Sequence, residues 1–342
     1  MSESTETNRR NLSLLQILAQ CAYFGLAHIA QRLQQIFVNL HHSDSVNLTT
    51  QSELKRNKRI KSFIETESTT AILQTNAKPF RISIIIPTYN EAATVKSTID
   101  SILRSLGNSE EYIEIIISDG GSSDDTVEIC RDYIAASSQQ TKIDIYFGGT
   151  NRSESQNIGA KQATGDVLLF LHADSILPLN WTKRVRISMN DRSNLMGCFL
   201  FSMILSEDTK KSGPINYWEL KYFEDFWITL CIFTIEAGTN FRSRYFHLPY
   251  GDQALFFRRN IFVDCFGGFP STPFMEDFDL VREVRRYGKI ITIPAFVKSS
   301  ARRWEKNGFL WNTVLNQVWQ GFYCCLIDCT KVHIPTLIIK FL

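Results

Sequence analysis

The sequence predicts an α/β protein with a mainly parallel sheet flanked by helices. Between Phe80 and Leu171, short runs rich in isoleucine, valine and leucine alternate with longer segments of helical pattern. Strands that alternate in this way with helices are typical of βαβ units, whose strands lie parallel. Hydrophobic residues make up 44% of the 342 residues and charged residues 21%, which are globular rather than disordered proportions.

Four buried strands are expected in this region, because each run is continuously apolar and β-branched. They cover residues 81–87, 113–118, 143–147 and 166–171. Three helices are expected between them, over residues 91–106, 124–136 and 153–163. Gly107 ends the first of these helices, and Ser153 with Gln156 matches a capping box at the start of the third.

Composition divides the chain into three parts. Residues 1–79 are expected to be a helical or disordered N-terminal extension, residues 80–305 the α/β domain, and residues 306–342 a C-terminal helical tail. The most apolar part of the extension, residues 14–30, is shorter than the roughly 20 residues of a spanning helix and lacks a secretory signal pattern. A helix on a membrane surface and a helix packed on the protein remain alternatives.

Two further segments were assigned by their side chains. The basic run Lys55 to Lys61 is expected to be a solvated linker, with a membrane-surface role as the alternative. Tyr217 to Ile235 is rich in aromatics but carries four charged residues, so a helix that covers the sheet is expected. A face lining an apolar acceptor site or touching a membrane is the alternative there.

Charge and cysteine usage exclude some classes of protein. Lys and Arg number 37 and Asp and Glu 35, so no nucleic-acid partner is expected. The eight cysteines form no Cys-x-x-Cys zinc pair, which favours reduced thiols in a cytoplasmic protein.

Turn residues and carboxylates follow three of the expected strands. These segments are Pro87-Thr-Tyr-Asn-Glu91, Asp119-Gly-Gly-Ser-Ser-Asp124 and His172-Ala-Asp174. Ligands of parallel sheets bind beyond the carboxyl ends of the strands. The fingerprints of dinucleotide-binding folds and of P-loop NTPases are missing. A nucleotide with a metal-bound diphosphate would suit this rim.

The residue types at this rim suit such a ligand. Asp119 can accept a base N–H, Tyr89 offers a ring for stacking, and Glu91 can accept a ribose hydroxyl. Asp174 is an oxygen ligand suited to Mg²⁺ or Mn²⁺, and Arg152 lies where a helix start can meet an anion. Each has a simpler alternative: Asp119 as a turn residue, Asp174 as a cap and Tyr89 as core.

These motifs resemble the family 2 glycosyltransferases, which have the GT-A fold. Gly251-Asp-Gln253, Gly267-Gly-Phe-Pro270 and Phe274-Met-Glu-Asp-Phe-Asp279 resemble the acceptor half of that family. Together with Asn151 to Ala160 and Ser300 to Glu305, the motifs are similar to the subgroup called radical-SAM/selenodomain-associated transferase 2. The resemblance covers about Phe80 to Glu305.

The resemblance implies transfer of a hexose-type sugar from a nucleotide-diphosphate donor to an acceptor hydroxyl, with inversion. Asp277, beside Glu276, would be the general base. Asp174 and His172 would hold a Mg²⁺ or Mn²⁺ ion. The donor would be bound by Pro87, Thr88, Tyr89, Glu91, Asp119, Gly120, Arg152 and Ala173. The acceptor, with a lipid-linked one among the options, would be bound by Gln253, Arg303 and Trp304.

Two positions depart from the family pattern. His172 stands where the metal motif has its first acid, so this side chain could ligate metal, contact phosphate or simply be buried. Ser300 replaces the glutamine of the motif that grips a growing polymer, which favours addition of a single sugar.

Three alternatives remain open. A nucleotidyltransferase of the same fold would need a cationic cradle for a triphosphate, and only Arg152 was found for that role. A degenerate transferase that serves as a membrane-associated scaffold is the non-enzymatic alternative. The acidic start of the helix from Glu276 to Tyr287 could also serve stability alone.

Overall fold

The computed structural model describes residues 55–62, 81–106, 112–137, 141–205, 218–272, 275–309 and 311–313, with no side-chain description for residues 218–227. The chain forms two compact units, one of residues Gln51–Arg302 and one of Met1–Thr50 with Arg303–Leu342. The sheet belongs to the first unit. The helix expected near residues 14–30 and most of the expected C-terminal tail lie outside the described residues.

The first half of the sheet has four parallel strands, as the sequence predicts. They are β1 (Ile82–Thr88), β2 (Ile113–Asp119), β3 (Thr141–Phe147) and β4 (Val167–Phe170). Their order in the sheet is β3-β2-β1-β4. The chain therefore builds outward from β1 in one direction and then returns to place β4 on its other side.

The second half of the sheet is mixed. It comprises β5 (Ser175–Ile176), β6 (Asn194–Ile204), β7 (Phe256–Arg258) and β8 (Lys289–Ser300). Among the described residues the full order is β3-β2-β1-β4-β7-β6-β8-β5. β7 pairs antiparallel with β4 and with β6, whereas β6 and β8 are parallel. The expected α/β fold with a mainly parallel sheet is confirmed.

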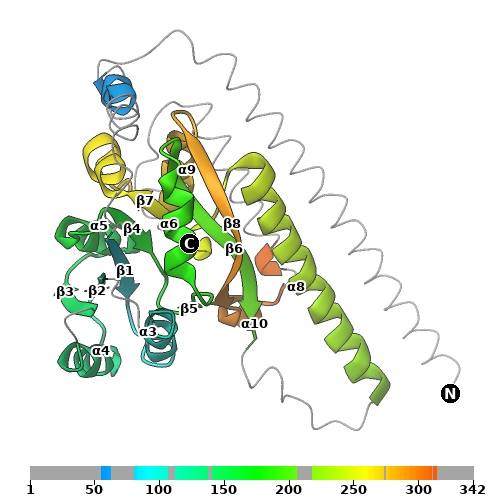
Figure 1. The fold of residues 1–342 in the computed structure, drawn as a ribbon. Coiled ribbons are helices and arrows are strands. Elements are labelled where there is room, and N and C mark those ends of the chain that lie inside the picture. The colour runs from blue at the N-terminus through cyan, green and yellow to red at the C-terminus, as the bar shows by residue number, and fades with distance from the viewer. Residues whose placement is uncertain are drawn as a thin grey trace, which may run out of the picture. The chain divides into compact units, whose positions relative to one another are not determined.

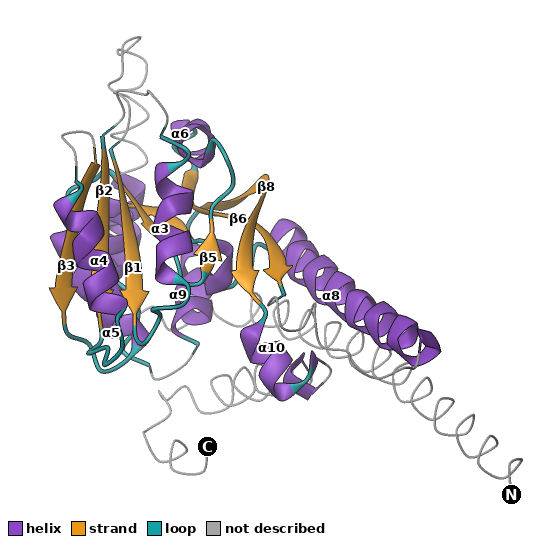
Figure 2. Ribbon diagram, turned by 90° about the horizontal axis from the view of Figure 1, so that it is seen from below, coloured by secondary structure: helices purple, strands orange, loops and turns teal. Residues whose placement is uncertain are grey.

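Helices lie against both faces of this sheet (Figures 1 and 2). They are α3 (Val95–Leu103), α4 (Thr126–Ala135), α5 (Arg152–Gln162), α6 (Trp181–Asn190), α8 (Trp218–Phe246) and α9 (Glu276–Val284). The 3-10 turn η2 (Gly251–Gln253) and the π-helix η3 (Ile261–Phe266) follow α8, and α10 (Arg302–Asn307) follows β8. The helix expected from Glu91 begins only at Val95, because the carbonyl of Glu91 first closes a turn with Thr94.

The start of α5 differs from the predicted capping box. Asn151, not Ser153, is the N-cap, and its side-chain oxygen accepts from the backbone N–H of Glu154 at 3.0 Å. Ser153 lies inside the first turn and donates to the same Asn151 oxygen at 2.7 Å. An asparagine cap satisfies an otherwise unpaired N–H of the helix start, so the prediction for Ser153 is wrong by two positions.

Close packing of α5 on the sheet depends on Gly159. A Cβ atom at this position would lie 2.6 Å from Ile85 Cγ2 and 2.6 Å from Ser118 Oγ. Contacts this short do not occur between real side chains, so only glycine lets α5 approach β1 and β2 this closely. The approach holds Arg152, the first residue of α5, near the rim of the sheet.

Residues 55–62 form a helix, so the expectation of a linker is wrong, although the side chains of Lys55, Lys58 and Lys61 are exposed to solvent as expected. Ile60 is buried in the first unit. Arg56 pairs with Glu283 of α9 at 2.7 Å, and Arg59 donates to the carbonyl of Asp264 at 3.1 Å. One apolar and two polar contacts thus attach the charged run to the first unit. The charge pattern of the sequence does not predict these contacts.

The aromatic segment after residue 217 is helical, as expected, and forms most of α8. This helix packs along β6. Asn240 bonds both the N–H and the carbonyl of Phe201, at 2.7 and 2.9 Å, and Glu236 accepts from the N–H of Met203 at 2.6 Å. Within the described part of the chain, no helix has the length and apolar character needed to cross a membrane.

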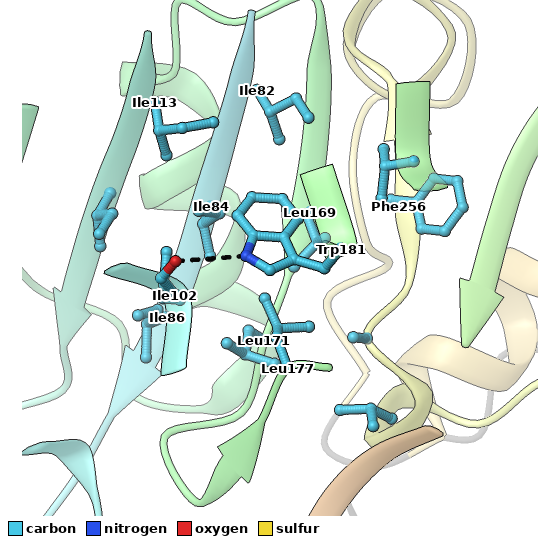
Figure 3. Close-up of a cluster of buried hydrophobic side chains, with 14 of the residues drawn as sticks. Ile82, Ile84, Ile86, Ile102, Ile113, Leu169, Leu171, Leu177, Trp181 and Phe256 are labelled. Atoms are coloured by element: carbon cyan, nitrogen blue, oxygen red, sulfur yellow. Dashed lines mark hydrogen bonds between the residues drawn. The ribbon is translucent and has the colours of Figure 1, made fainter. Parts of the chain in front are cut away.

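The core lies between β1, β2, β4 and the helices α3 and α6 (Figure 3). Trp181 is fully buried there at the start of α6, among isoleucine and leucine side chains. Its ring N–H donates to the carbonyl of Ile102 at 3.4 Å, across to the end of α3. One indole therefore fastens two helices to the same face of the sheet.

We expect Trp181→Ala to lower the free energy of unfolding by about 3–5 kcal/mol, because it leaves a large cavity in a fully packed site. Leu179→Ala is a matched control, since Leu179 lies two residues away and is 68% exposed. Its effect should stay within about 0.5 kcal/mol. Chemical denaturation of both variants measures the difference, and equal losses would contradict the packing described.

Candidate functional site

The predicted site residues gather at the carboxyl ends of the parallel strands. Strand order reverses between β1 and β4, which are neighbours although two other strands separate them along the chain. Ligands of open α/β sheets bind in the crevice at such a switch point. The segment after β1 carries Tyr89 and Glu91, and the segment after β4 carries His172 and Asp174.

Asp119, at the end of β2, organises the loop that follows it. Its carboxylate accepts from Thr88 Oγ1 at 2.8 Å, from the N–H groups of Gly121 and Ser122 at 2.9 and 2.8 Å, and from Ser122 Oγ at 2.6 Å. The residue is 1% exposed. Four hydrogen-bond donors of the protein therefore already occupy the Asp119 carboxylate, which the sequence predicts to contact the nucleotide base.

The loops after β1 and β2 are joined by Asn90 as well. Its side-chain oxygen accepts from the N–H of Ser123 at 2.8 Å, and its own N–H donates to Ser122 Oγ at 2.9 Å. The backbone φ of Asn90 is 55°, a left-handed conformation that asparagine tolerates better than most residues. The neighbouring Tyr89 is 65% exposed, which leaves its ring open for stacking on a flat ligand.

The carboxylates of Asp174, the predicted metal ligand, and of Glu91 both contact the same arginine side chain. Arg302, the first residue of α10, donates to Glu91 Oε1 and lies 3.2 Å from Asp174 Oδ2. Burial raises the pKa of Asp174, although His172 and Arg302 act in the opposite direction. The hydrogen bond to Glu91 raises the pKa of Arg302, so the guanidinium stays charged.

A second group forms around the η2 turn. His172 Nδ1 lies 2.8 Å from Asp252 Oδ1. The N–H of Gly251 donates to Asp277 Oδ2 at 2.6 Å. The turn thus contacts the histidine of one predicted motif and the expected base of another.

Arg152 links this group to the start of α9. Its Nε donates to Glu276 Oε1 at 2.7 Å, and Glu276 is 3% exposed. Burial by itself would lower the pKa of Arg152, but the charges of Glu276, Asp277 and Asp252 together raise it. Asp252 also acts on Asp174, so both groups belong to one charged cluster.

The expected acceptor residues are placed differently from one another. Gln253 is fully buried, and its amide donates to the carbonyl of Phe199 at 2.8 Å and to Ser243 Oγ at 3.1 Å. This side chain has no exposed surface with which to meet an acceptor. Arg303 and Trp304 belong to the second compact unit, so their roles stay predictions.

The remaining residues that are expected to bind the sugar donor contribute backbone atoms rather than side chains to the site. Thr88 is buried, and its carbonyl accepts from the N–H of Gly120 at 2.9 Å. Ala173 is buried, and its carbonyl accepts from Thr98 Oγ1 at 2.8 Å. Pro87 is half-buried within β1. These residues shape the floor of the rim.

The metal-ligating side chains at the rim suit a cation that binds together with a phosphate ligand. In the described ranges, no three His, Cys, Asp or Glu side chains form a metal cage of their own. Asp174 and the Nε2 atom of His172 offer two ligands. Mg²⁺-type ions are commonly held by one or two carboxylates, with substrate phosphates and water completing the shell.

The sequence alone does not single out two residues of the charged cluster. Asp252 lies inside the Gly251-Asp-Gln253 motif, in which the sequence favours Gln253 as the acceptor-binding residue. Arg302 directly precedes the predicted Arg303. The motifs signalled both neighbourhoods, whereas only coordinates tell which side chain points into the rim.

Comparison with known proteins identifies the family. Residues 83–259, more than half of the chain, match the profile described as glycosyl transferase family 2. The chain therefore belongs to glycosyl transferase family 2. With the strand order found, its α/β domain has the GT-A fold.

Curated relatives match over shorter stretches. An uncharacterized glycosyltransferase of Haemophilus influenzae is 34% identical over 98 residues, which are 28% of this chain and 37% of the relative. The glycosyltransferase AglE of Haloferax volcanii is 30% identical over 112 residues, 32% of this chain and 35% of AglE. The chain thus spans about a third of the length of these relatives.

Solved structures that match this chain do so at low sequence identity. The mannosyltransferase PcManGT from Pyrobaculum calidifontis, in complex with GDP-Man and Mn²⁺, has a TM-score of 0.48 and 15% identity. The match covers 82% of this chain and 76% of that one. TarS of S. aureus with UDP-GlcNAc has a TM-score of 0.47 and 14% identity, covering 64% of this chain and 58% of that one.

We expect Asp119→Ala to lower the free energy of unfolding by about 2 kcal/mol, because four donors lose their acceptor. Asp119→Asn should lose less than half as much, since its oxygen can still accept from two N–H groups while its amide donates to the two hydroxyls. Denaturant titration measures both, with Asp125→Ala as control, because the Asp125 side chain makes no capping hydrogen bond. An Asp119→Ala variant as stable as the parent would contradict the bracing role.

Proposed function

We propose that this protein transfers a sugar from a nucleotide-diphosphate donor to an acceptor hydroxyl, with inversion at the anomeric carbon. One observation carries the proposal. Gly251 contacts the carboxylate of Asp277 and borders His172, so the expected base and the expected cation site face one turn. An inverting transfer needs a base on one side of the anomeric carbon and a charge-stabilised leaving group on the other.

The donor would bind across the loops after β1, β2 and β4. The exposed ring of Tyr89 would stack on the base, and Glu91 would accept a ribose hydroxyl. Asp119 would form the base pocket mainly by holding its loop, since protein donors occupy its carboxylate. Arg152 would meet the diphosphate with its guanidinium and with the start of α5.

A divalent cation would be held by Asp174 and His172. When bound, it would stabilise the negative charge of the leaving diphosphate as a Lewis acid. An imidazole ligand favours Mn²⁺ over Mg²⁺, because nitrogen ligands suit transition metals better. The residues of the chain would orient the diphosphate against this site.

Asp277 would act as the general base. It lies in the first turn of α9, and its Oδ2 atom accepts a hydrogen bond from the N–H of Gly251 at 2.6 Å. As the acceptor oxygen forms its bond to the anomeric carbon, its proton passes to Asp277. The bond from the anomeric carbon to the diphosphate oxygen breaks with its electron pair, so charge and atoms balance.

Other features stay predictions of the same proposal. Arg303 and Trp304 would contact the acceptor, and a lipid-linked acceptor is consistent with a peripheral membrane contact of a cytoplasmic enzyme. The exposed basic side chains of residues 55–62 could face an anionic surface. Membership of the radical-SAM/selenodomain-associated subgroup also stays a prediction.

We expect a nucleotide sugar to raise the melting temperature of the wild-type protein more with Mn²⁺ than without it, because binding to the folded state stabilises it by mass action. Asp174→Ala should abolish the Mn²⁺-dependent part of this shift. A thermal-shift panel of UDP- and GDP-sugars measures it, with the exposed Asp132→Ala as control. No shift with any donor would contradict the proposal, and pyrophosphate release from a nucleoside triphosphate and a sugar phosphate would favour a nucleotidyltransferase.

We expect Asp277→Asn to keep donor binding but to lower the transfer rate by about 10²–10⁴-fold, because the amide cannot accept the proton of the acceptor hydroxyl. Asp279→Asn, two residues further along α9, is the matched control and should keep the parental rate. The rate is measured as nucleoside diphosphate released in the presence of the acceptor. An Asp277→Asn variant with full turnover would refute the assignment of the base.

A further inference from the structure

Asp252 has no part in the proposed reaction, although it lies within the charged cluster. Its Oδ1 atom is 2.8 Å from Nδ1 of His172, and the side chains are 35% and 13% exposed, respectively. Both residues therefore meet in a partly shielded place, where a hydrogen bond is stronger than in bulk water. The geometry raises the question of what this bond does for His172.

The chemistry of the pair determines which nitrogen of the His172 ring carries the hydrogen that Asp252 accepts. An ionised carboxylate can only accept hydrogen bonds, so Nδ1 of His172 carries the hydrogen. In the neutral ring, Nε2 is then left with a lone pair. In metal sites, a ligating histidine almost always donates its other N–H to a carboxylate or carbonyl, which orients the ring.

The Nε2 atom opens toward the base side of the rim. A Cβ atom on Gly251 would lie 3.3 Å from His172 Nε2 and 3.0 Å from Asp277 Oδ2. The glycine thus separates the imidazole nitrogen from the base carboxylate without filling the space between them. His172 is also two residues from Asp174, which supplies the oxygen ligand of the proposed cation site.

Asp252 is held by a turn that is itself fixed. The next residue, Gln253, is fully buried, and its oxygen accepts from the N–H of Tyr250 at 3.0 Å. Its amide nitrogen donates to β6 and to α8, through the carbonyl of Phe199 and Ser243 Oγ. The backbone that carries Asp252 is therefore anchored on two elements, which pre-organises the carboxylate for His172.

From these contacts, we propose that Asp252 is a positioning residue that holds Nε2 of His172 as a nitrogen ligand for the divalent cation of the donor complex. The inference rests on the proposed function, because it assigns a partner to the cation site of that reaction. It also gives the buried Gln253 a purpose, which is to brace the turn rather than to contact an acceptor.

The test measures Mn²⁺ binding directly in the full chain, with UDP and separately with GDP. Electron paramagnetic resonance gives the Mn²⁺ affinity, and electron spin-echo modulation shows whether an imidazole nitrogen is coordinated. We expect Asp252→Ala to weaken Mn²⁺ binding by about 10–100-fold and to lose or weaken the nitrogen signal. Asp252→Asn, whose oxygen can still accept from Nδ1, should stay within about threefold of the wild type.

The double variant separates positioning from a general charge effect. If Asp252 acts through His172, then His172→Ala/Asp252→Ala should bind Mn²⁺ no more weakly than His172→Ala alone. Asp264→Ala removes one exposed carboxylate from the same unit and should leave Mn²⁺ affinity unchanged. Thermal melts verify that each variant is folded.

Four outcomes would overturn the inference, and those that refute the proposed function can be told apart from those that do not. Wild-type binding of Mn²⁺ with no nitrogen signal would exclude His172 as a ligand. Unchanged affinity in a folded Asp252→Ala variant, or additive losses in the double variant, would remove the positioning role while leaving the proposed function intact. Absence of any Mn²⁺ and nucleotide binding by the wild type would refute the proposed function and this inference together.

Discussion

The pairing of charges at the carboxyl rim is the constraint on which the site depends. Placing a carboxylate in a shielded position without a partner is unfavourable by several kcal/mol, so each one needs a nearby cation or donor. Arg302 meets this need for Glu91, which is 211 positions away in the sequence, and Arg152 meets it for Glu276. The segments that follow β1 and β8 therefore come together at the rim, where Glu91 pairs with Arg302. The residues that form the ion pairs of the rim are thus the same residues that would bind the ligand.

The first half of the fold could be predicted because its signals are local. The Ile-rich run of β1 is buried at almost every position, and a continuous apolar run of this length between turn residues has few alternatives to a central parallel strand. The order of strands and helices then determines which loops share a rim. For this reason, the motifs after β1, β2 and β4 could be assigned to one edge without coordinates.

The second half could not be predicted because its determinants are not local. β5 has two residues and β7 has three, too few for any periodicity to appear. In a short polar motif, the sequence does not show which side chain is buried and which is directed at the site. The sequence therefore assigns Gln253 to a ligand, although its neighbour Asp252 is the residue directed at His172. The capping error at Ser153 has a similar origin, since Asn151 and Ser153, two positions apart, both suit a helix start and only the backbone decides between them.

The balance of charge at the rim bears on the proposed cation and its place beside the η2 turn. The carboxylates outnumber the guanidiniums in the set formed by Glu91, Asp174, Asp252, Glu276, Asp277, Arg152 and Arg302. An anionic diphosphate that approached this surface alone would be repelled by the excess of negative charge. In the proposed complex, a divalent cation that arrives with the diphosphate would reverse the sign of that interaction. A histidine at this position would supply a ligand to that cation, whereas a second acid would add one more negative charge to the rim.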